Sequence, residues 1–423
     1  MMRVVSAEEA VAGIQSGDQV FVHGAAATPT ALLEALAARA GTLRDVGVVH
    51  LHTEGPAPHL APAMAGHLRH RALFIGANAR AAVAEGRAEY IPVFLSDIPA
   101  LIARGKIRVD VALLNLTPPD RHGFCSLGPS VDVAVAAART ARTVIALLNP
   151  ALPRTHGDGF VHISRVDYGV ELRAAPHQAP PQVIDAVERR IGERVAGLVP
   201  PGATLQLGIG AIPDAVAAAL VHHRDLGIHS EMFTDVVVDL VERGVVTGTQ
   251  KEINPGKIVA AFVAGTQRLY DFVDDNPLVE LRPADYTNDS AIIRRFRRMT
   301  AINSAVEIDL TGQVCADSIG HRLLSGVGGQ MDFIRGAALA EDGRAIIALP
   351  STAARGSCSR IVVALRPGAG VVTTRAHVET VVTEHGVAEL VGRSIPERAR
   401  ALIGLAEPRF RDELSAAARA AGV

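Results

Sequence analysis

The chain has 423 residues, of which 48% are hydrophobic and 20% are charged, and its formal net charge is −2. So high an apolar content excludes disorder of the whole chain, and the length is typical of two or three domains. With no basic excess, four Tyr and no Trp, the sequence lacks the positive field and stacking surfaces of a nucleic-acid binder. We therefore expect no nucleic-acid partner.

The cysteines and the chain start indicate a cellular setting. Cys125, Cys315 and Cys358 are far apart and form no C-x-x-C pair, which predicts a reducing compartment and no structural zinc. Residues 6–9, Ser-Ala-Glu-Glu, have the pattern of a helix capping box. The best apolar run, residues 258–265, is about half as long as the roughly 18 residues of a membrane span. A cytoplasmic protein without a membrane segment is expected.

The first 150 residues alternate between short apolar runs and helical patterns. That alternation favours an α/β fold with a largely parallel sheet. Helices are expected at residues 31–40 and 131–142. Buried strands are expected at residues 19–22, 48–51, 73–75, 109–114 and 144–148.

A proline-rich stretch at residues 174–181 predicts a domain boundary, followed by a helix at 182–198. We place the domains at 1–179 and 180–423. Residues 17–29 and 202–213 then match as turn, strand, small-residue loop, proline and alanine-rich helix. The sequence therefore predicts two similar open α/β domains with mostly parallel sheets, facing each other.

Several familiar catalytic motifs are absent from the sequence. It contains no G-x-S-x-G, no H-E-x-x-H and no G-x-x-x-x-G-K-[ST]. Residues 208–213 begin like a dinucleotide fingerprint, but Pro213 stands where the third glycine belongs. A small-residue loop before a helix can still hold a phosphate on its backbone N–H groups. His222, His223 and His229 lie near acidic residues, but with 16 histidines in the chain we assign no metal.

Three stretches in the second half have an unusual composition for scaffold. Residues 226–235 place Glu231 on a short turn before an apolar helix, where a carboxylate can act on a ligand or simply favour the helix dipole. Residues 325–333 hold three glycines in four positions, typical of close backbone approach or of a tight turn. Residues 349–357 form a polar loop with Arg355, which can meet an anion or remain solvated.

Longer stretches of the sequence resemble the acetyl-CoA hydrolase/transferase family, which includes 4-hydroxybutyrate CoA-transferase-like enzymes. The resemblance covers nearly the whole chain. It rests on Gly208-Ile-Gly-Ala-Ile-Pro213, Gly227-Ile-His-Ser-Glu-Met232, Tyr286-Thr-Asn-Asp289, residues 302–313, 325–333, 350–352, 382–388 and 408–414, and on 90–96, 118–123 and 153–158 in the first half.

The resemblance implies a catalytic role for one glutamate. Glu231 would attack an acyl-CoA carbonyl to form an acyl-glutamyl anhydride, and the released thiolate would convert this to a glutamyl-CoA thioester. The active site would lie in a cleft between the domains, which excludes water. Gly328 or Gly329 matches the position of the oxyanion-hole donor. Binding roles fall on the CoA loop, which is Gly208, Ile209, Gly210, Ala211 and Ile212, and on Asn303, Gln330 and Arg355.

The expected function is therefore a CoA-transferase acting between a short-chain acyl-CoA and a carboxylate such as acetate. An acyl-CoA hydrolase that uses the same glutamate is the alternative, and a non-catalytic ligand-binding protein of the same fold is a third reading. CoA is expected as a substrate and no permanent cofactor is expected. The family implies a homo-oligomer. Cys315, His385 and residues 294–298 depart from the family pattern, which leaves the acid substrate open.

Overall fold

The computed structural model describes residues 2–422, which group into two compact units. Of the described residues, unit 1 contains 2–180, 259–287 and 324–328, and unit 2 contains 181–258, 288–323 and 329–422. Both units are discontinuous in sequence, since two short segments of the second half fold with the first. The domain division into 1–179 and 180–423 stays a prediction.

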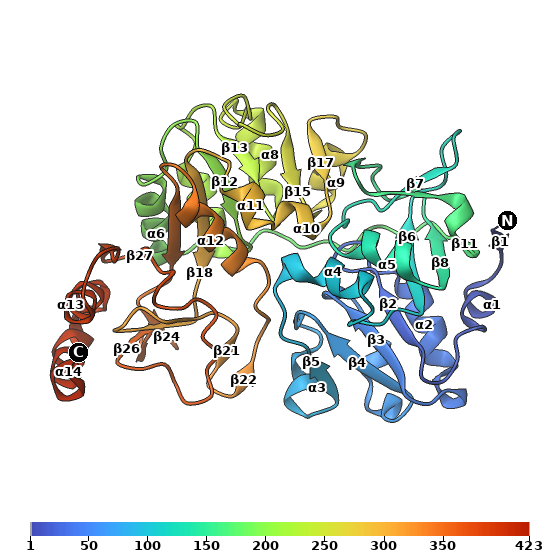
Figure 1. Cartoon of the computed structure of the whole chain (residues 1–423), viewed down its shortest axis with the longest axis horizontal. Helices are drawn as coiled ribbons and strands as arrows, with labels where there is room; N and C mark the ends of the chain where they lie inside the picture. The colour runs from blue at the N-terminus through green and yellow to red at the C-terminus, as the bar shows by residue number, and fades with distance from the viewer. Residues whose placement is uncertain (1, 423) are drawn as a thin grey trace. The chain divides into compact units, whose positions relative to one another are not determined.

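Unit 1 is built on an eight-stranded sheet in which every neighbouring pair is parallel. Its core joins the sheet to α1 (Ala7–Val11) and α2 (Thr30–Ala38). Helices α3 (Arg80–Ala84), α4 (Ile98–Ala103) and α5 (Ala134–Thr140) also belong to unit 1 and alternate with its strands along the chain (Figure 1). In spatial order the strands are β1 (Arg3–Val4), β11 (Tyr168–Glu171), β8 (Thr143–Leu148), β6 (Val111–Leu116), β2 (Gln19–Val22), β3 (Val46–His50), β4 (Leu68–Ala72) and β5 (Ala88–Tyr90).

Unit 2 is also built on a largely parallel sheet with helices packed on it. Among the six strands of this sheet from β28 to β13, only the β27–β28 pair is antiparallel. Helices α6 (Ala186–Ala196), α7 (Ala211–Ala219), α8 (Asp235–Glu242), α12 (Gln330–Leu339), α13 (Ile395–Leu405) and α14 (Pro408–Ala421) belong to this unit. Six neighbouring strands of this sheet are, in spatial order, β28 (Gly386–Glu389), β27 (Thr380–Thr383), β23 (Arg344–Ala348), β18 (Met299–Ser304), β12 (Thr204–Leu207) and β13 (Gly227–His229). The predicted α/β class with mostly parallel sheets is confirmed.

Three predicted elements differ from the observed ones by three residues or more at one end. The strand predicted at 73–75 is β4 at Leu68–Ala72, where half-buried Arg69 and Arg71 alternate with buried residues and so interrupt the apolar run. The helix predicted at 131–142 is α5, which begins at Ala134 because the N–H groups of Val131 and Asp132 both donate to the Ala261 carbonyl. The helix predicted at 182–198 is α6.

Helix starts follow the capping chemistry in the sequence. Ser6 and Glu9 form the expected capping box of α1, and Asp185 with Glu188 caps α6 in the same way. The Asp185 cap explains why α6 starts at Ala186, four residues after the predicted position. Among residues 2–422, no helix combines the length and the apolar character that crossing a membrane requires.

Candidate active site

Glu231 follows the carboxyl end of β13 and precedes β14 (Met232–Phe233). The adjacent Ser230 is buried, and its hydroxyl donates to the Leu207 carbonyl at 3.1 Å and accepts from the Leu207 N–H at 3.3 Å. Leu207 ends β12, the parallel neighbour of β13. These two hydrogen bonds fasten the Glu231 turn to the edge of the sheet where parallel strands end, which is the usual ligand edge of an α/β fold.

The Glu231 carboxylate meets a buried amide. Asn288 Nδ2 donates to Glu231 Oε2 at 3.2 Å and to Asp332 Oδ2 at 3.3 Å. An amide NH₂ carries two hydrogens, so it can serve both carboxylates at once. Asn288 is fully buried and precedes α11 (Ser290–Ile293). The side chain therefore fixes one carboxylate oxygen of Glu231.

The backbone of Gly329 lies directly against this pair. A Cβ atom at Gly329 would overlap both Glu231 Oε2 and Asn288 Nδ2, so only glycine fits. Gly329 is also the N-cap residue of α12, whose first turn contains Asp332. Its neighbour Gly328 belongs to unit 1, where it forms a bridge with Phe94 and has φ +57°, a left-handed conformation that favours glycine. The predicted oxyanion positions are thus two glycines that are each required by the local geometry.

The predicted CoA loop follows β12 at the same edge of the sheet. Gly210, with φ +113°, is the N-cap residue of α7 and provides no side-chain cap. Ile209 is 65% exposed, whereas Ile212 is buried in the first turn. The small-residue loop and the helix N-terminus together match the geometry that holds phosphate groups.

A buried acid lies in the first turn of α7. Burial raises the pKa of the Asp214 carboxyl, and the nearby charge of Asp235 raises it further, against the lowering effect of a backbone hydrogen bond from Gln182. An acid at this position is favourable for the helix dipole. Desolvation of the Asp214 carboxylate opposes this stabilisation and is the larger effect, so the pKa is raised.

Asn303 and Gln330 lie in unit 2 on different elements. Asn303 is near the end of β18, and its Nδ2 donates to Gln206 Oε1 at 2.9 Å on the neighbouring strand β12. Gln330 is the first residue of α12, and its Nε2 donates to Thr373 Oγ1 at 3.3 Å. Because β18, β12 and β13 are parallel neighbours, Asn303, the Gly208 loop and Glu231 reach one edge of the sheet.

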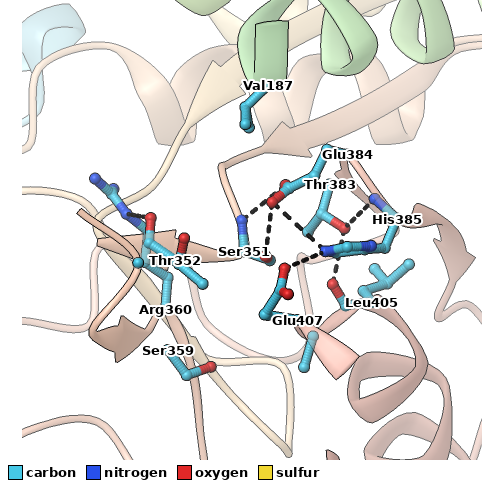
Figure 2. Close-up of polar contacts among 12 residues, drawn as sticks. Val187, Ser351, Thr352, Ser359, Arg360, Thr383, Glu384, His385, Leu405 and Glu407 are labelled. Carbon is cyan, nitrogen blue, oxygen red and sulfur yellow. Dashed lines mark hydrogen bonds and ion pairs between the residues drawn. The ribbon is translucent and has the colours of Figure 1, made fainter. Parts of the chain in front are cut away.

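Arg355 extends from a hairpin at the end of β23. It is exposed, has φ +54°, and lies between β24 (Thr352–Ala353) and β25 (Cys358–Ser359). The loop that leads to it is anchored by Ser351, whose N–H and hydroxyl donate to the two oxygens of buried Glu384 at 2.9 and 2.7 Å. Figure 2 shows this anchor beside His385, whose Nε2 lies 2.9 Å from Glu407 Oε2.

The three histidines that lie near acidic residues in the sequence, His222, His223 and His229, do not form a metal site in the structure. His223 Nε2 lies 3.1 Å from the Ala196 carbonyl, and the buried His229 ring packs against Phe296. Within residues 2–422, neither they nor His222 belong to a group of side chains whose ligand atoms converge on one point.

Sequence reasoning assigned no role to Asn288 or Asp332. Both lie in stretches that carried the family resemblance, 286–289 and 325–333, so the signal was present. Asn288, however, meets Glu231 from 57 residues away along the chain and Asp332 from 44 residues away. Ser230 was likewise only a neighbour of the proposed nucleophile.

Comparison with known proteins identifies the family. Residues 1–175 match the acetyl-CoA hydrolase/transferase N-terminal domain and residues 265–418 match the C-terminal domain. The chain belongs to the acetyl-CoA hydrolase/transferase family. The predicted resemblance is confirmed, although Glu231 and the Gly208 loop lie between the two matched ranges.

The similar proteins match over almost their whole length. The 4-hydroxybutyrate coenzyme A transferase of Clostridium kluyveri is 47% identical over 97% of this chain and 96% of its own. The succinyl-CoA:acetate/propanoyl-CoA:succinate CoA transferase of Fasciola hepatica is also 47% identical, over 97% and 86%. The crystal structure of 4-hydroxybutyrate CoA-transferase from Porphyromonas gingivalis is 38% identical and has a TM-score of 0.86, with 99% of this chain and 97% of that one covered.

Proposed function

We propose that this chain is a CoA-transferase that moves CoA between a short-chain acyl-CoA and a carboxylate such as acetate. The observation that carries the proposal is the Glu231 carboxylate, held by the buried Asn288 amide and in contact with the Gly329 backbone. The reaction class agrees with the names of the two relatives that are 47% identical.

In the proposed first half-reaction, one Glu231 oxygen attacks the thioester carbonyl carbon. The carbonyl π electrons move to oxygen, then re-form the carbonyl as the C–S bond breaks and CoA leaves as a thiolate. The product is a mixed anhydride between the acyl group and Glu231. Attack of the thiolate on the glutamyl carbonyl releases the acid and leaves a glutamyl-CoA thioester.

The incoming carboxylate reverses these steps. It attacks glutamyl-CoA, expels the thiolate and forms a new mixed anhydride, from which the thiolate removes the acyl group. Each addition creates an oxyanion, and a backbone donor at Gly328 or Gly329 would be worth about 3–4 kcal/mol of barrier. The Asn288 N–H, already 3.2 Å from Glu231 Oε2, supports the oxyanion on the glutamyl carbon.

Binding roles follow the edge of the unit 2 sheet. The Gly208 loop and the start of α7, through Ala211, would hold a CoA phosphate on backbone N–H groups. Asn303 and Gln330 would contact the reacting carbonyl or carboxylate. Arg355 would meet a CoA phosphate from its exposed hairpin. The cytoplasmic location and homo-oligomeric assembly remain predictions.

The test is exchange and trapping. Incubation with an acyl-CoA and labelled acetate should transfer CoA to acetate, and borohydride should reduce the Glu231–CoA thioester to an alcohol, with release of CoA and a mass change on Glu231. Glu231→Gln should abolish both, whereas the exposed control Glu242→Gln should retain both. Release of free CoA without transfer to the acid would identify a hydrolase instead. Substantial exchange by Glu231→Gln would refute the nucleophile, and binding of acyl-CoA without any turnover would favour a ligand-binding protein.

A further inference from the structure

Three buried histidines of unit 1 converge on one point. His50 ends β3, His70 lies in the middle of β4, and His59 lies in the 3-10 turn η2 (Pro58–Leu60), which packs against β4. In the parallel register Val48 pairs with His70, so His50, two residues further along, points to the same face of the sheet. Their exposed fractions are 0%, 2% and 1% for His50, His59 and His70.

The nitrogen atoms of the cluster are closely spaced. His50 Nε2 lies 3.2 Å and His59 Nε2 lies 3.1 Å from the same atom, His70 Nδ1. All three nitrogens lie within 4.8 Å of one another. In a tetrahedral zinc site with Zn–N distances of about 2.0–2.1 Å, two ligand nitrogens are about 3.3–3.4 Å apart. The two distances to His70 Nδ1 are close to that value.

Hydrogen bonding alone accounts poorly for this arrangement. A neutral imidazole has one N–H and one lone pair. His70 Nδ1 can therefore accept one good hydrogen bond, yet two ring nitrogens face it. The remaining nitrogens, His50 Nδ1, His59 Nδ1 and His70 Nε2, have no hydrogen-bond partner among residues 2–422. A cation between the three rings would use all three inner lone pairs at once.

The protonation state fits metal binding. Burial lowers the pKa of His59 to about 4, and burial together with the neighbouring His59 lowers the pKa of His70 to about 3. Burial and the other histidines also hold the pKa of His50 well below its usual range. The rings are neutral at pH 7, and the neutral imidazole is the form that coordinates metals.

We propose that His50, His59 and His70 form a structural site for a late transition-metal dication, with Zn²⁺ as the expected occupant. Three imidazoles suit zinc, cobalt, nickel or copper, whereas magnesium and calcium prefer oxygen ligands. Water or hydroxide would complete the tetrahedron. The metal would cross-link β3, β4 and the η2 turn. The site is separate from the proposed Glu231 chemistry and does not depend on it.

A second group, Glu384, His385 and Glu407 in unit 2, also offers three ligand atoms. Its polar atoms are already engaged. Both Glu384 oxygens accept hydrogen bonds from Ser351, and His385 Nε2 contacts Glu407 (Figure 2). This group is a satisfied network and serves as the matched control.

The first experiment uses the wild-type chain. Because the histidines are buried, the protein is expressed or refolded with Zn²⁺, then passed through metal-free buffer and analysed for metal by mass spectrometry. About one zinc per chain is expected. X-ray absorption at the zinc edge should show three nitrogen donors at about 2.0–2.1 Å. Protein prepared in this way that retains no zinc overturns the proposal without any variant.

Variants then locate the metal. His59→Gln, in the η2 turn, should lower retained zinc at least about tenfold, since even outer-shell changes cost about 10–100-fold in affinity. His385→Gln should retain the wild-type zinc content. Loss of zinc from His385→Gln but not from His59→Gln would place the metal at the second group and overturn the proposal. An anomalous-scattering map of the wild-type crystal decides the site if His59→Gln does not fold.

Discussion

Asn288 Nδ2 bridges the carboxylates of Glu231 and Asp332, at 3.2 and 3.3 Å. One buried amide therefore fixes the orientation of Glu231 and holds two acids near each other. Glu231 Oε2 is the oxygen that Asn288 engages. After Glu231, Asn288 is therefore the residue whose replacement tests the proposed mechanism most directly.

Asn288→Ala should reduce kcat by about 100-fold, because donors to a developing oxyanion contribute about 10²–10³ in rate. Loss of the amide also leaves the Glu231 and Asp332 carboxylates without the donor between them. Steady-state exchange kinetics and borohydride trapping measure the effect. Asn276→Ala, which removes a bond to the Phe272 carbonyl in unit 1, is the control and should leave exchange unchanged. Wild-type kcat in Asn288→Ala would remove the residue from the mechanism.

Gly329→Ala should lower the exchange rate at least about 100-fold, because the added methyl group overlaps Glu231 Oε2 and Asn288 Nδ2. The matched control is Gly404→Ala, in the last turn of α13, where an added Cβ meets nothing within 4 Å. Gly404→Ala should retain activity, because the added methyl group displaces no neighbouring atom. Exchange rates and denaturant melts of the two variants give the comparison. Equal activity in both would show that the Gly329 contact is unimportant.

The sequence predicted much of the scaffold. Strand β2 has the predicted bounds, residues 19–22, because it is buried on both faces and its last three residues form a continuous apolar run. Strand β4 was misplaced because its half-buried Arg69 and Arg71 interrupt the apolar pattern. Periodicity detects elements that are buried throughout, whereas an alternating strand beside short turns gives a weaker signal.

The site was predictable where local sequence carries its signal. The turn with Glu231 and the glycines at 328 and 329 were identified from composition and family resemblance. The Asn288 contact arises only when β13, α12 and the segment before α11 come together in the fold, so no spacing rule predicts it. The cluster of His50, His59 and His70 depends in the same way on the β3–β4 register and on the η2 turn.

Asp214→Asn should make stability less sensitive to pH. Burial raises the pKa of Asp214, so the folded protein binds this proton more tightly than the unfolded chain does. The stability contributed by the protonated acid is therefore full below the ordinary Asp pKa and is lost as the pH rises through the raised value. Relative to wild type, Asp214→Asn should be more stable at pH 8 than at pH 4. Denaturant unfolding at both pH values tests this, with the exposed Asp412→Asn as control, and an unchanged difference would contradict it.

Native thiol labelling should modify one cysteine, Cys358. Burial raises the pKa of the Cys125 thiol to about 11 and also raises that of Cys315, and both side chains are fully buried. At pH 8 a thiol with a pKa of 11 is about 0.1% thiolate, against about a quarter for an unperturbed one. Cys358 is only partly buried, in the short strand β25. Iodoacetamide should therefore add one group per native chain and three after unfolding, as counted by intact mass. Cys358→Ser should show no native labelling, and labelling of Cys125 at the rate of Cys358 would mean that β7 (Phe124–Ser126) opens readily in the folded state.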